Sequence, residues 1–406
     1  MYLCRRMMNE ATRLFIRQHL QDDIRQLALR GTKDPEVDLA FALQQIDGHR
    51  RALEKLPTWA TIEGFVWPSH LSMEQCSSER TALYKAGVAG CGESFVDLTA
   101  GFGVDAAFIA QGFQRAVCVE VQPELCAISS ANFQLLGLHQ TEVVNGNGVD
   151  YLHEMPPADL VFIDPARRDE HGGRTYGIAD CTPNVLEMID ELLAKAQRVM
   201  IKLSPMLDWR KAVADLGEQN VSAVHIVSVN NECKELLIVV ECGAWSVEGG
   251  YSVHCVNLLS DGSEERFEFD AQAPSPIKIL HSPLFTFHFL YEPNASVMKA
   301  GCFDLLAERF GVMPLHRNSH LFVSDAEVAD FPGRGFVIER TTSMNKRELR
   351  DSLAGVTQAN IAVRNFPLST ADLRKRLKLL DGGDIYIFAT TVANQGHRLF
   401  FCRKIS

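Results

Sequence analysis

The sequence predicts an α/β protein whose central domain is a parallel sheet, closed by an antiparallel hairpin and covered by helices on both faces. Three observations lead to this prediction. Short apolar runs alternate with helical patterns from residue 93 to about residue 217, which is typical of successive βαβ units. The last two apolar runs are separated by only four residues, too few for a crossover helix. On either side of this region the rhythm changes, which indicates separate segments.

The first segment, residues 1–80, is predicted to be helical. Apolar residues recur at helical spacing from Leu14 onward, as expected for amphipathic helices. A second helix is expected to start with Asp34 as its N-cap and Pro35 at its first position. A third is expected to begin near Ser77 or Ser78. These signals predict an N-terminal helical region that leads into the central domain.

The central domain is predicted to span residues 81–245. Its expected strands are, in order, ESFVDL, RAVCVEV, TEVVNG, ADLVFID and RVMIKLS. The helices between and after them are VDAAFIAQG, PELCAISSANFQLLG, PNVLEMIDELLAKA and DWRKAVADLG. The runs VSAVHIVSV and KELLIVVE form the closing hairpin, since a connection this short forces antiparallel pairing.

Two further segments complete the predicted organisation. Residues 246–330 are expected to form a β-rich, ferredoxin-like linker domain. Residues 331–406 are expected to form a small α/β module, in which strands alternate with the helices KRELRDSL and TADLRKRLKLL before a final hairpin.

Composition and cysteine usage are those of an ordinary globular protein. The chain has 406 residues, 46% of them hydrophobic and 22% charged, enough for two or three domains. Its eleven Cys residues include no C-x-x-C pair, which argues against zinc-ribbon and iron–sulfur sites and against a disulfide framework. The start of the chain lacks the apolar core of a signal peptide, and no run has the length of a membrane span. We therefore expect a cytoplasmic protein.

Charge is distributed unevenly along the chain. The net charge is -11, yet residues 334–378 carry ten Lys and Arg against four Asp and Glu. That segment is therefore strongly basic within an acidic protein. Such asymmetry indicates a local surface for nucleic acid or phosphate, although a solvated helix face explains it almost as well.

The stretch DLTAGFG, residues 97–103, lies where the first predicted strand meets its helix. Gly101 and Gly103 would let the backbone approach a ligand there, and the helix N-terminus supplies free N–H groups. Glu120, at the end of the second strand, would hold a ribose hydroxyl. The spacing Gly-x-Gly-x-x-Ala also fits a dinucleotide site, so the loop alone leaves NAD and S-adenosylmethionine open.

Three features favour S-adenosylmethionine as the cofactor. Asp97 precedes the loop, where it can contact an amino group but would repel a pyrophosphate. Asn147 follows the third strand, where its amide could recognise an adenine edge. The antiparallel hairpin departs from the all-parallel dinucleotide sheet. Thr99 is expected to line the same site, and Thr81 and Lys85 could touch the cofactor's carboxylate, although a surface helix face is the more common role of such residues.

The run VFIDPARRDE ends the fourth strand with Asp164 and Pro165. Both residues favour turns, so a tight turn explains the pair locally. The carboxyl end of a parallel strand is also where an α/β sheet binds its ligands. Because methyl transfer is an in-line displacement, such an enzyme mainly positions the acceptor against the sulfonium methyl. We therefore expect Asp164 to line the active site.

These motifs carry a resemblance to known proteins. DLTAGFG, Glu120, DPAR and the hairpin resemble class I S-adenosylmethionine-dependent methyltransferases over about residues 81–245. EQCSSERTALYKAG, IKLSPMLD and RNFPLSTADLRKRLKLLDGGDIYIFATT are similar to a bacterial family of methyltransferases with a C-terminal THUMP-like domain. This second resemblance covers nearly the whole chain. It implies a Rossmann-like methyltransferase domain with an accessory module related to RNA-binding THUMP domains, so residues 331–406 are expected to be THUMP-like.

The resemblance also implies a role for the DPAR motif. In base-amino methyltransferases, an Asp or Asn followed by Pro-Pro and an aromatic residue accepts hydrogen bonds from an exocyclic amino group. The motif also resembles the DPPR of uridine-C5 methyltransferases. Ala166 departs from both patterns. Carbon methylation needs a thiolate, and this chain has Ser204 at the corresponding place, with Cys233 as the only substitute, so a nitrogen acceptor is favoured.

The expected function is methylation of an RNA base nitrogen in the cytoplasm, without metal or membrane. Alternatives are a small-molecule or protein methyltransferase, or an RNA-binding protein that holds the cofactor without turnover. Arg167 and Arg168 could bind a substrate phosphate or be solvated loop charges, and Lys202 could reach the site or extend its charge to solvent. The expected catalytic residues are Asp164, Pro165 and Arg167, and the expected substrate-binding residues are Arg168, Lys202, Ser204, Arg374, Lys375 and Arg376.

Overall fold

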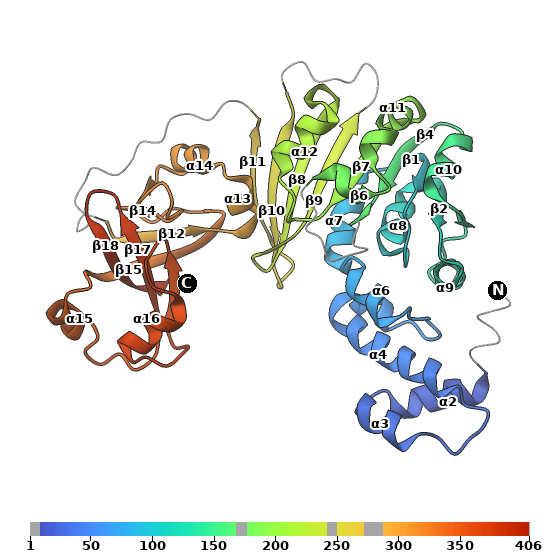
Figure 1. Ribbon diagram of the computed structural model, residues 1–406, viewed down its shortest axis with the longest axis horizontal. Coiled ribbons are helices and arrows are strands. Elements are labelled where there is room, and N and C mark those ends of the chain that lie inside the picture. Colours follow the sequence, from blue (N-terminus) through green and yellow to red (C-terminus); the bar gives the residue numbers. More distant parts are fainter. Residues whose placement is uncertain (1–8, 168–176, 242–249, 272–286, 406) are drawn as a thin grey trace. The chain divides into compact units, whose positions relative to one another are not determined.

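The computed structural model describes residues 9–167, 177–241, 250–271 and 287–405, which belong to two compact units. The first unit is formed by Met1–Val224 with Glu235–Tyr251, and the second by His225–Lys234 with Ser252–Ser406. The helices and strands of both units are labelled in Figure 1. The N-terminal helices belong to the first unit, together with most of the predicted central domain, whose residues His225–Lys234 belong to the second unit. The boundaries of the four domains expected from the sequence stay predictions.

The N-terminal helices are α2 (Glu10–His19), α3 (Ile24–Arg30) and α4 (Leu39–Lys55). The expected helix start at Asp34 and Pro35 is wrong. Asp34 accepts the Glu36 N–H in a turn at 2.9 Å, whereas Asp38 accepts the Phe41 N–H at 3.0 Å and caps α4. Both aspartates are followed by suitable N–H donors, but only Asp38 directly precedes the apolar periodicity that buries one side of a helix.

Three shorter helices lead from α4 into the sheet: α5 (Pro57–Ala60), α6 (His70–Gln75) and α7 (Glu79–Ala89). Ser78 caps α7, as the sequence predicts. The backbone of Val66 exchanges two hydrogen bonds with the side chain of Asn132, at 2.9 and 2.8 Å. Because these groups are buried and paired, the N-terminal region is fastened to the central domain by specific contacts.

Seven strands of the larger sheet follow in the order β8-β9-β7-β4-β1-β2-β3. Its first five strands along the chain pair in parallel, while β9 runs antiparallel to β7. A turn at Asn230 and Asn231, both with positive φ, joins β8 to β9, as Asn favours in tight hairpins. The predicted parallel sheet with an antiparallel hairpin is therefore confirmed. Its strands are β1 (Gly92–Asp97), β2 (Phe113–Glu120), β3 (Thr141–Asn145), β4 (Ala158–Ile163), β7 (Ala196–Leu203), β8 (Val221–Val229) and β9 (Glu232–Glu241).

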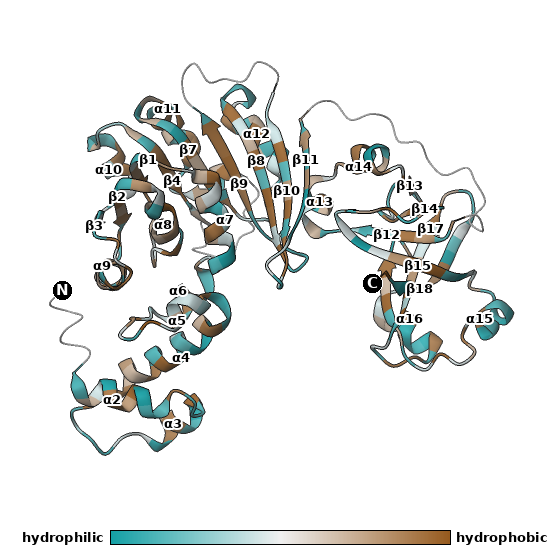
Figure 2. Cartoon of the chain, turned by 180° about the vertical axis from the view of Figure 1, so that it is seen from behind, coloured by the Kyte–Doolittle hydropathy of each residue, from teal (hydrophilic) through white to brown (hydrophobic). Residues whose placement is uncertain are grey.

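The central strands are buried on both faces. Phe95 and Phe162 pack into one apolar cluster with residues of the N-terminal helices and of α8. Their neighbours in the strands, Val96 and Val161, point to the opposite face and are also buried. Figure 2 shows these strands as predominantly hydrophobic, as expected for a sheet covered on both sides. The surrounding helices are α8 (Val104–Ile109), α9 (Pro123–Leu135), α10 (Gly148–Glu154), α11 (Val185–Lys195) and α12 (Trp209–Leu216).

The second unit contains the antiparallel pair β10 (Ser252–Leu258) and β11 (Glu264–Asp270) and a separate seven-stranded sheet. The order of that sheet is β13-β14-β12-β15-β18-β17-β16. Among its described strand pairs, only β16 and β17 are parallel. The strands are β12 (Phe289–Pro293), β13 (Met313–Pro314), β14 (Phe322–Ser324), β15 (Gly333–Thr342), β16 (Asn360–Arg364), β17 (Ile385–Val392) and β18 (Gly396–Lys404).

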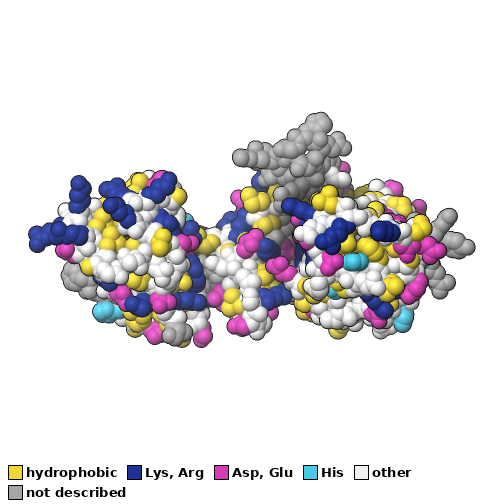
Figure 3. Space-filling model, turned by 90° about the horizontal axis from the view of Figure 1, so that it is seen from below, with side chains coloured by type: hydrophobic (Ala, Val, Ile, Leu, Met, Phe, Trp, Pro, Cys, Tyr) yellow, Lys and Arg dark blue, Asp and Glu magenta, His cyan; other side chains and the backbone are white. Residues whose placement is uncertain are grey.

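Among the helices in the described part of this unit, two lie within the basic segment. They are α15 (Lys346–Ser352) and α16 (Thr370–Leu377), which follow α13 (Ala295–Ala300) and α14 (Phe303–Phe310). Leu349, Leu373 and Leu377 join one apolar cluster with the sheet, so both helices cover the same face. Figure 3 shows Lys and Arg side chains gathered on the surface of this unit, at the left of the view. No helix in the described ranges combines the length and apolarity needed to cross a membrane.

Candidate active site

The loop between β1 and α8 has the backbone conformation that the sequence predicts. Gly101 and Gly103 have φ angles of 55° and 79°, in the left-handed region that glycine adopts without steric cost. A Cβ atom on Gly103 would lie 2.7 Å from the ring of Phe133. Position 103 therefore requires glycine for conformation and for packing, and the loop passes closely over α9.

Glu120 lies directly against this loop. It is the last residue of β2, and its carboxylate accepts hydrogen bonds from the Gly101 and Gln122 N–H groups, each at 2.8 Å. The side chain is mostly buried, with 8% of the residue exposed. A carboxylate oxygen has more than one lone-pair direction, so this arrangement fixes Glu120 and still leaves capacity for a further hydrogen bond. The predicted contact with a ribose hydroxyl stays a prediction.

Asp97 links the loop to the neighbouring strand end. It is almost fully buried, and its carboxylate accepts the Thr99 N–H at 2.8 Å. Burial raises the pKa of Asp97 well above its usual range, and the nearby carboxylates of Asp105 and Asp164 raise it further. The hydroxyl of Thr99 in turn accepts the Asp164 N–H at 2.7 Å. The ends of β1 and β4 are thus joined through Thr99.

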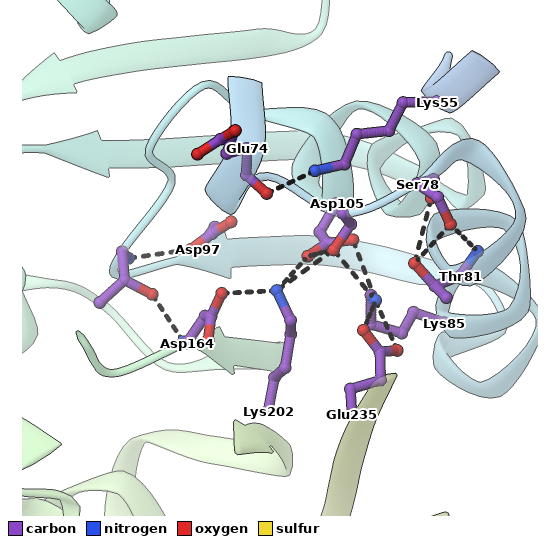
Figure 4. A network of polar contacts seen from close by, with 12 residues as sticks. Lys55, Glu74, Ser78, Thr81, Lys85, Asp97, Asp105, Asp164, Lys202 and Glu235 are labelled. Atoms are coloured by element: carbon purple, nitrogen blue, oxygen red, sulfur yellow. Dashed lines mark hydrogen bonds and ion pairs between the residues drawn. The ribbon is translucent and has the colours of Figure 1, made fainter. Parts of the chain in front are cut away.

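Asp164 follows β4 and is partly open to solvent, with 38% of its side chain exposed. Its Oδ2 atom lies 2.6 Å from the ammonium of Lys202 on β7. That ammonium also donates to Ser77 Oγ at 3.1 Å and to Asp105 Oδ2 at 3.3 Å. Figure 4 shows this group of polar contacts. Lys202 therefore points toward the site, and its charge is not extended to bulk solvent.

Lys85 lies deeper in the same network. It is fully buried and donates to both carboxylate oxygens of Glu235 at 2.6 Å, and its Nζ atom is 3.2 Å from Asp105 Oδ1. Burial opposes the charged form of Asp105, but Lys85 and Lys202 hold the pKa of Asp105 below its usual value. We name this group, formed by Ser77, Lys85, Asp105, Lys202 and Glu235, the ionic network. The predicted contact between Lys85 and the cofactor stays a prediction.

The remaining predicted cofactor residues are spread around the loop. Asn147 caps α10, where its side-chain oxygen accepts the Val149 N–H at 2.8 Å, and it is exposed. The preceding Gly146 N–H donates to the carbonyl of Glu120, which places Asn147 beside the end of β2. Thr81 is buried in α7, and its hydroxyl donates to the carbonyl of Ser78. Both assignments stay predictions.

The remaining predicted catalytic and substrate-binding residues lie in different parts of the chain. Pro165 is buried directly after Asp164, and Ser204 lies just beyond β7. The backbone of Arg167 belongs to β5 (Ala166–Arg167), which pairs with β6 (Cys181–Thr182). Arg168 lies outside the described residues. The three basic candidates of the second unit, Arg374, Lys375 and Arg376, are all on α16.

Sequence reasoning missed three members of the ionic network. Asp105 stands in the first turn of an otherwise apolar helix, and Glu235 stands at the head of the apolar run ELLIVV. A charged residue in such a run is a signal, because buried charges are costly unless they are paired. Ser77 has no comparable signal. In the described ranges, no three His, Cys, Asp or Glu side chains are placed to hold a metal ion, and the metal-free reaction stays a prediction.

Two known domain families match the C-terminal part of the chain. A ferredoxin-like domain family matches residues 289–332, and a THUMP domain-like family matches residues 333–404. No curated protein sequence matches significantly. Among solved structures, an rRNA methylase from Streptococcus thermophilus is 20% identical over 40% of this chain and 94% of its own, with a TM-score of 0.29. TrmK of M. capricolum, in complex with S-adenosyl-homocysteine, is 14% identical over 41% and 70%, with a TM-score of 0.33.

A full-length relative is far more similar. The crystal structure of a protein from Porphyromonas gingivalis W83, described as a "putative methyltransferase", is 31% identical to this chain. The alignment covers 98% of this chain and 100% of the relative, with a TM-score of 0.87. The chain therefore belongs to the family of this protein, that of the class I S-adenosylmethionine-dependent methyltransferases with a C-terminal THUMP-like domain.

Proposed function

We propose that this protein methylates a base nitrogen of RNA, with Asp164 and the carbonyl of Pro165 orienting the acceptor amino group. The observation that carries the proposal is the position of Asp164. It lies at the carboxyl end of β4, is partly exposed, and is tied by its own N–H to Thr99 of the cofactor loop. Its carboxylate therefore lies beside that loop, at the edge where parallel α/β sheets bind their ligands.

The residues around the loop fit S-adenosylmethionine. Glu120 presents a fixed carboxylate for a ribose, and the left-handed glycines keep the loop free of side chains at the ligand. Asp97 is buried beside the loop, which raises its pKa well above the usual range, and its carboxyl oxygens can accept a hydrogen bond from an amino group. When bound, the cofactor supplies an activated methyl group on a sulfonium.

Asp164 can act on an amino group in two ways. Its carboxylate accepts a hydrogen bond from the acceptor N–H, which turns the nitrogen lone pair toward the methyl group. The same negative charge stabilises the positive charge that develops on the nitrogen during transfer. A carbonyl from Pro165 can accept the second N–H. Such a pair of acceptors favours an exocyclic amino group over a hydroxyl, which has only one proton to donate.

The second unit supplies a surface suited to the RNA backbone. On α15, Lys346, Arg347 and Arg350 are exposed, and on α16 Lys375 and Arg376 are exposed. We name these five residues the basic patch. Lys and Arg bind phosphates, and binding releases counterions from the RNA. Arg374 is different, because it donates to the Ala359 carbonyl and to Asp381, at 3.1 and 2.5 Å.

A methyl-transfer assay tests the proposed function. Labelled S-adenosylmethionine is incubated with the protein and with total RNA from cells that lack the gene, and modified nucleosides are identified by mass spectrometry. We expect a methylated base nitrogen with the native protein and none with Asp164→Ala. A matched control is Asp208→Ala, because Asp208 is an aspartate that caps α12. Transfer to small molecules or proteins but not to RNA would contradict the proposal, as would RNA binding without any transfer.

A further inference from the structure

Within the described part of the chain, only one oxygen of the Asp164 carboxylate is held by a partner. Oδ2 is 2.6 Å from the Lys202 ammonium, whereas no described residue donates a hydrogen bond to Oδ1. A free aspartate side chain rotates between several orientations. A charge-assisted bond to a fixed cation restricts that rotation. The contact therefore selects which oxygen is available to a ligand.

Lys202 can serve as such an anchor only if it is itself fixed. Its Nζ atom contacts Ser77, Asp105 and Asp164, which saturates the three N–H donors of an ammonium. The three partners come from the segment before α7, from α8 and from the end of β4. Only 13% of the Lys202 side chain is exposed. A long side chain that is normally mobile is thus held in one position.

The deeper part of the ionic network fixes the partners of Lys202. Lys85 binds both oxygens of Glu235 and approaches Asp105 Oδ1 at 3.2 Å, while Ser77 donates to Asp105 Oδ2 at 2.7 Å. Asp105 is consequently held between two ammonium groups. The two lysines of this network are matched in number by its two carboxylates, Asp105 and Glu235. Asp164 is therefore an additional carboxylate, and it is the one that is partly exposed.

We propose that Lys202 is a positioning residue, which is held by Asp105 and Ser77, fixes one oxygen of Asp164 and presents the other oxygen to the methyl acceptor. This inference rests on the proposed function of Asp164. It gives Lys202 a role behind the carboxylate, where the sequence predicts direct contact with the substrate. It also makes Asp105 and Ser77, from two elements outside the DPAR motif, part of the machinery that orients the acceptor.

The charge of Lys202 is maintained by its surroundings. Burial alone would lower its pKa, but Asp164, Asp105 and Glu235 raise the pKa of Lys202 well above its usual value. Lys202 therefore keeps its proton across the range in which enzymes are assayed, and loses it only at strongly alkaline pH. The titratable and charged groups that face it are Asp164, Asp105, Glu235, Lys85, Asp97 and Cys76.

The test compares Lys202→Met and Asp105→Asn with the native protein. Lys202→Met keeps the apolar stem and removes the charge, and we expect kcat/KM for RNA to fall about 100-fold, the cost of a misplaced reacting group. Asp105→Asn keeps the shape of the side chain, and we expect a smaller fall, about 10-fold.

Binding measurements separate positioning from misfolding. The dissociation constant for S-adenosylmethionine should change less than about twofold in both variants if the fold is intact. The matched control is Lys211→Met, the same substitution at an exposed lysine of α12 that pairs with Asp215, and it should leave the rate unchanged. A native rate in folded Lys202→Met and Asp105→Asn would overturn the inference.

A second measurement does not depend on the acceptor. Crystal structures of native protein and Lys202→Met, each with S-adenosyl-homocysteine, should show the Asp164 carboxylate rotated in the variant. An identical carboxylate in both structures would overturn the inference even if RNA is methylated. If the native protein transfers no methyl group to RNA, the proposed function fails, and the two crystal structures still decide whether Lys202 positions Asp164.

Discussion

Each unit of the protein contains a buried carboxylate held by two cations, and the two arrangements differ in what they leave open. In the second unit, Glu292 of β12 is 3% exposed and is bound by Arg334 and Arg364, with Arg364 Nη2 at 2.9 Å from Oε1. Both of its oxygens are occupied. In the first unit, Asp105 is similarly held between Lys85 and Lys202. Lys202 also contacts Asp164, whose second oxygen accepts no hydrogen bond from a described residue.

The difference indicates how structural and functional charge clusters can be told apart. The cluster around Glu292 closes on itself, and its arginines place about two fifths of their side chains in solvent. The ionic network has the opposite order, since its cations are buried and Lys202 contacts Asp164, a partly exposed carboxylate outside the network. We expect a closed cluster to contribute to folding, whereas a carboxylate with an unoccupied oxygen at the end of a sheet can meet a ligand.

The largest expected effect comes from Asp164→Asn. Lys202 can only donate, so the new amide should turn its oxygen toward Lys202 and its NH₂ group toward the acceptor. Two donors would then face each other, and we expect kcat/KM to fall about 10²- to 10³-fold, as when a transition-state contact is lost. Steady-state kinetics with RNA measure the loss.

A double variant sharpens this prediction. In Lys202→Met with Asp164→Asn, the amide is free to turn its oxygen to the acceptor, so the double variant should be more active than Asp164→Asn alone. Additive losses would show that Lys202 does not select the open oxygen.

A smaller effect is expected from Glu292→Gln, and on stability only. The amide replaces one carboxylate oxygen by a donor that faces an arginine, so a charged hydrogen bond is lost from a buried position. We expect the second unit to lose about 2 kcal/mol of unfolding free energy, a figure reduced because both arginines are partly solvated. Urea unfolding measures the change. A fall in kcat at saturating RNA would contradict the contrast between the closed and the open cluster.

The sequence predicts the sheet well because a strand that is buried on both faces is recognisable as a continuous apolar run. Strands such as ADLVFID are apolar throughout, and short connections decide the direction of pairing. It also places Asp164 at the carboxyl end of β4, because Asp-Pro favours a turn and directly follows the apolar run. The fold class and the family are confirmed.

The ionic network could not be predicted in the same way. Lys85 and Glu235 lie 150 residues apart in the sequence, and no local pattern reports such a pair. Each lysine taken alone suits a solvated helix face or a strand end, and the signal at Asp105 and Glu235 does not name their partners. Only the fold brings together α7, α8, β7 and β9, and with them the charges that make one another's burial possible.

The basic patch should affect RNA affinity and leave the ionic network unchanged. Charge reversal at Lys375 and Arg376 to Glu should weaken RNA binding about 10-fold at moderate salt and lower the slope of log affinity against log salt. Filter binding at several salt concentrations measures both. The matched control is Arg13→Glu with Arg17→Glu, since these are exposed cations on a helix of the first unit. Equal effects of the two pairs would show that only net charge matters.

Asp97 is expected to make the unfolding free energy depend on pH. Burial raises the pKa of Asp97 well above the ordinary value of 3.8. At pH values between 3.8 and the raised pKa, Asp97 holds a proton in the folded protein that the unfolded chain has released. The contribution of Asp97 to stability therefore falls as pH rises through that window. Asp97→Asn has no such proton. The difference in unfolding free energy between native protein and Asp97→Asn, measured with urea at several pH values, should therefore favour the variant increasingly as pH rises above about 4. A constant difference would mean that Asp97 is ionised in the folded protein, and that the cofactor loop meets its ligand with a full negative charge.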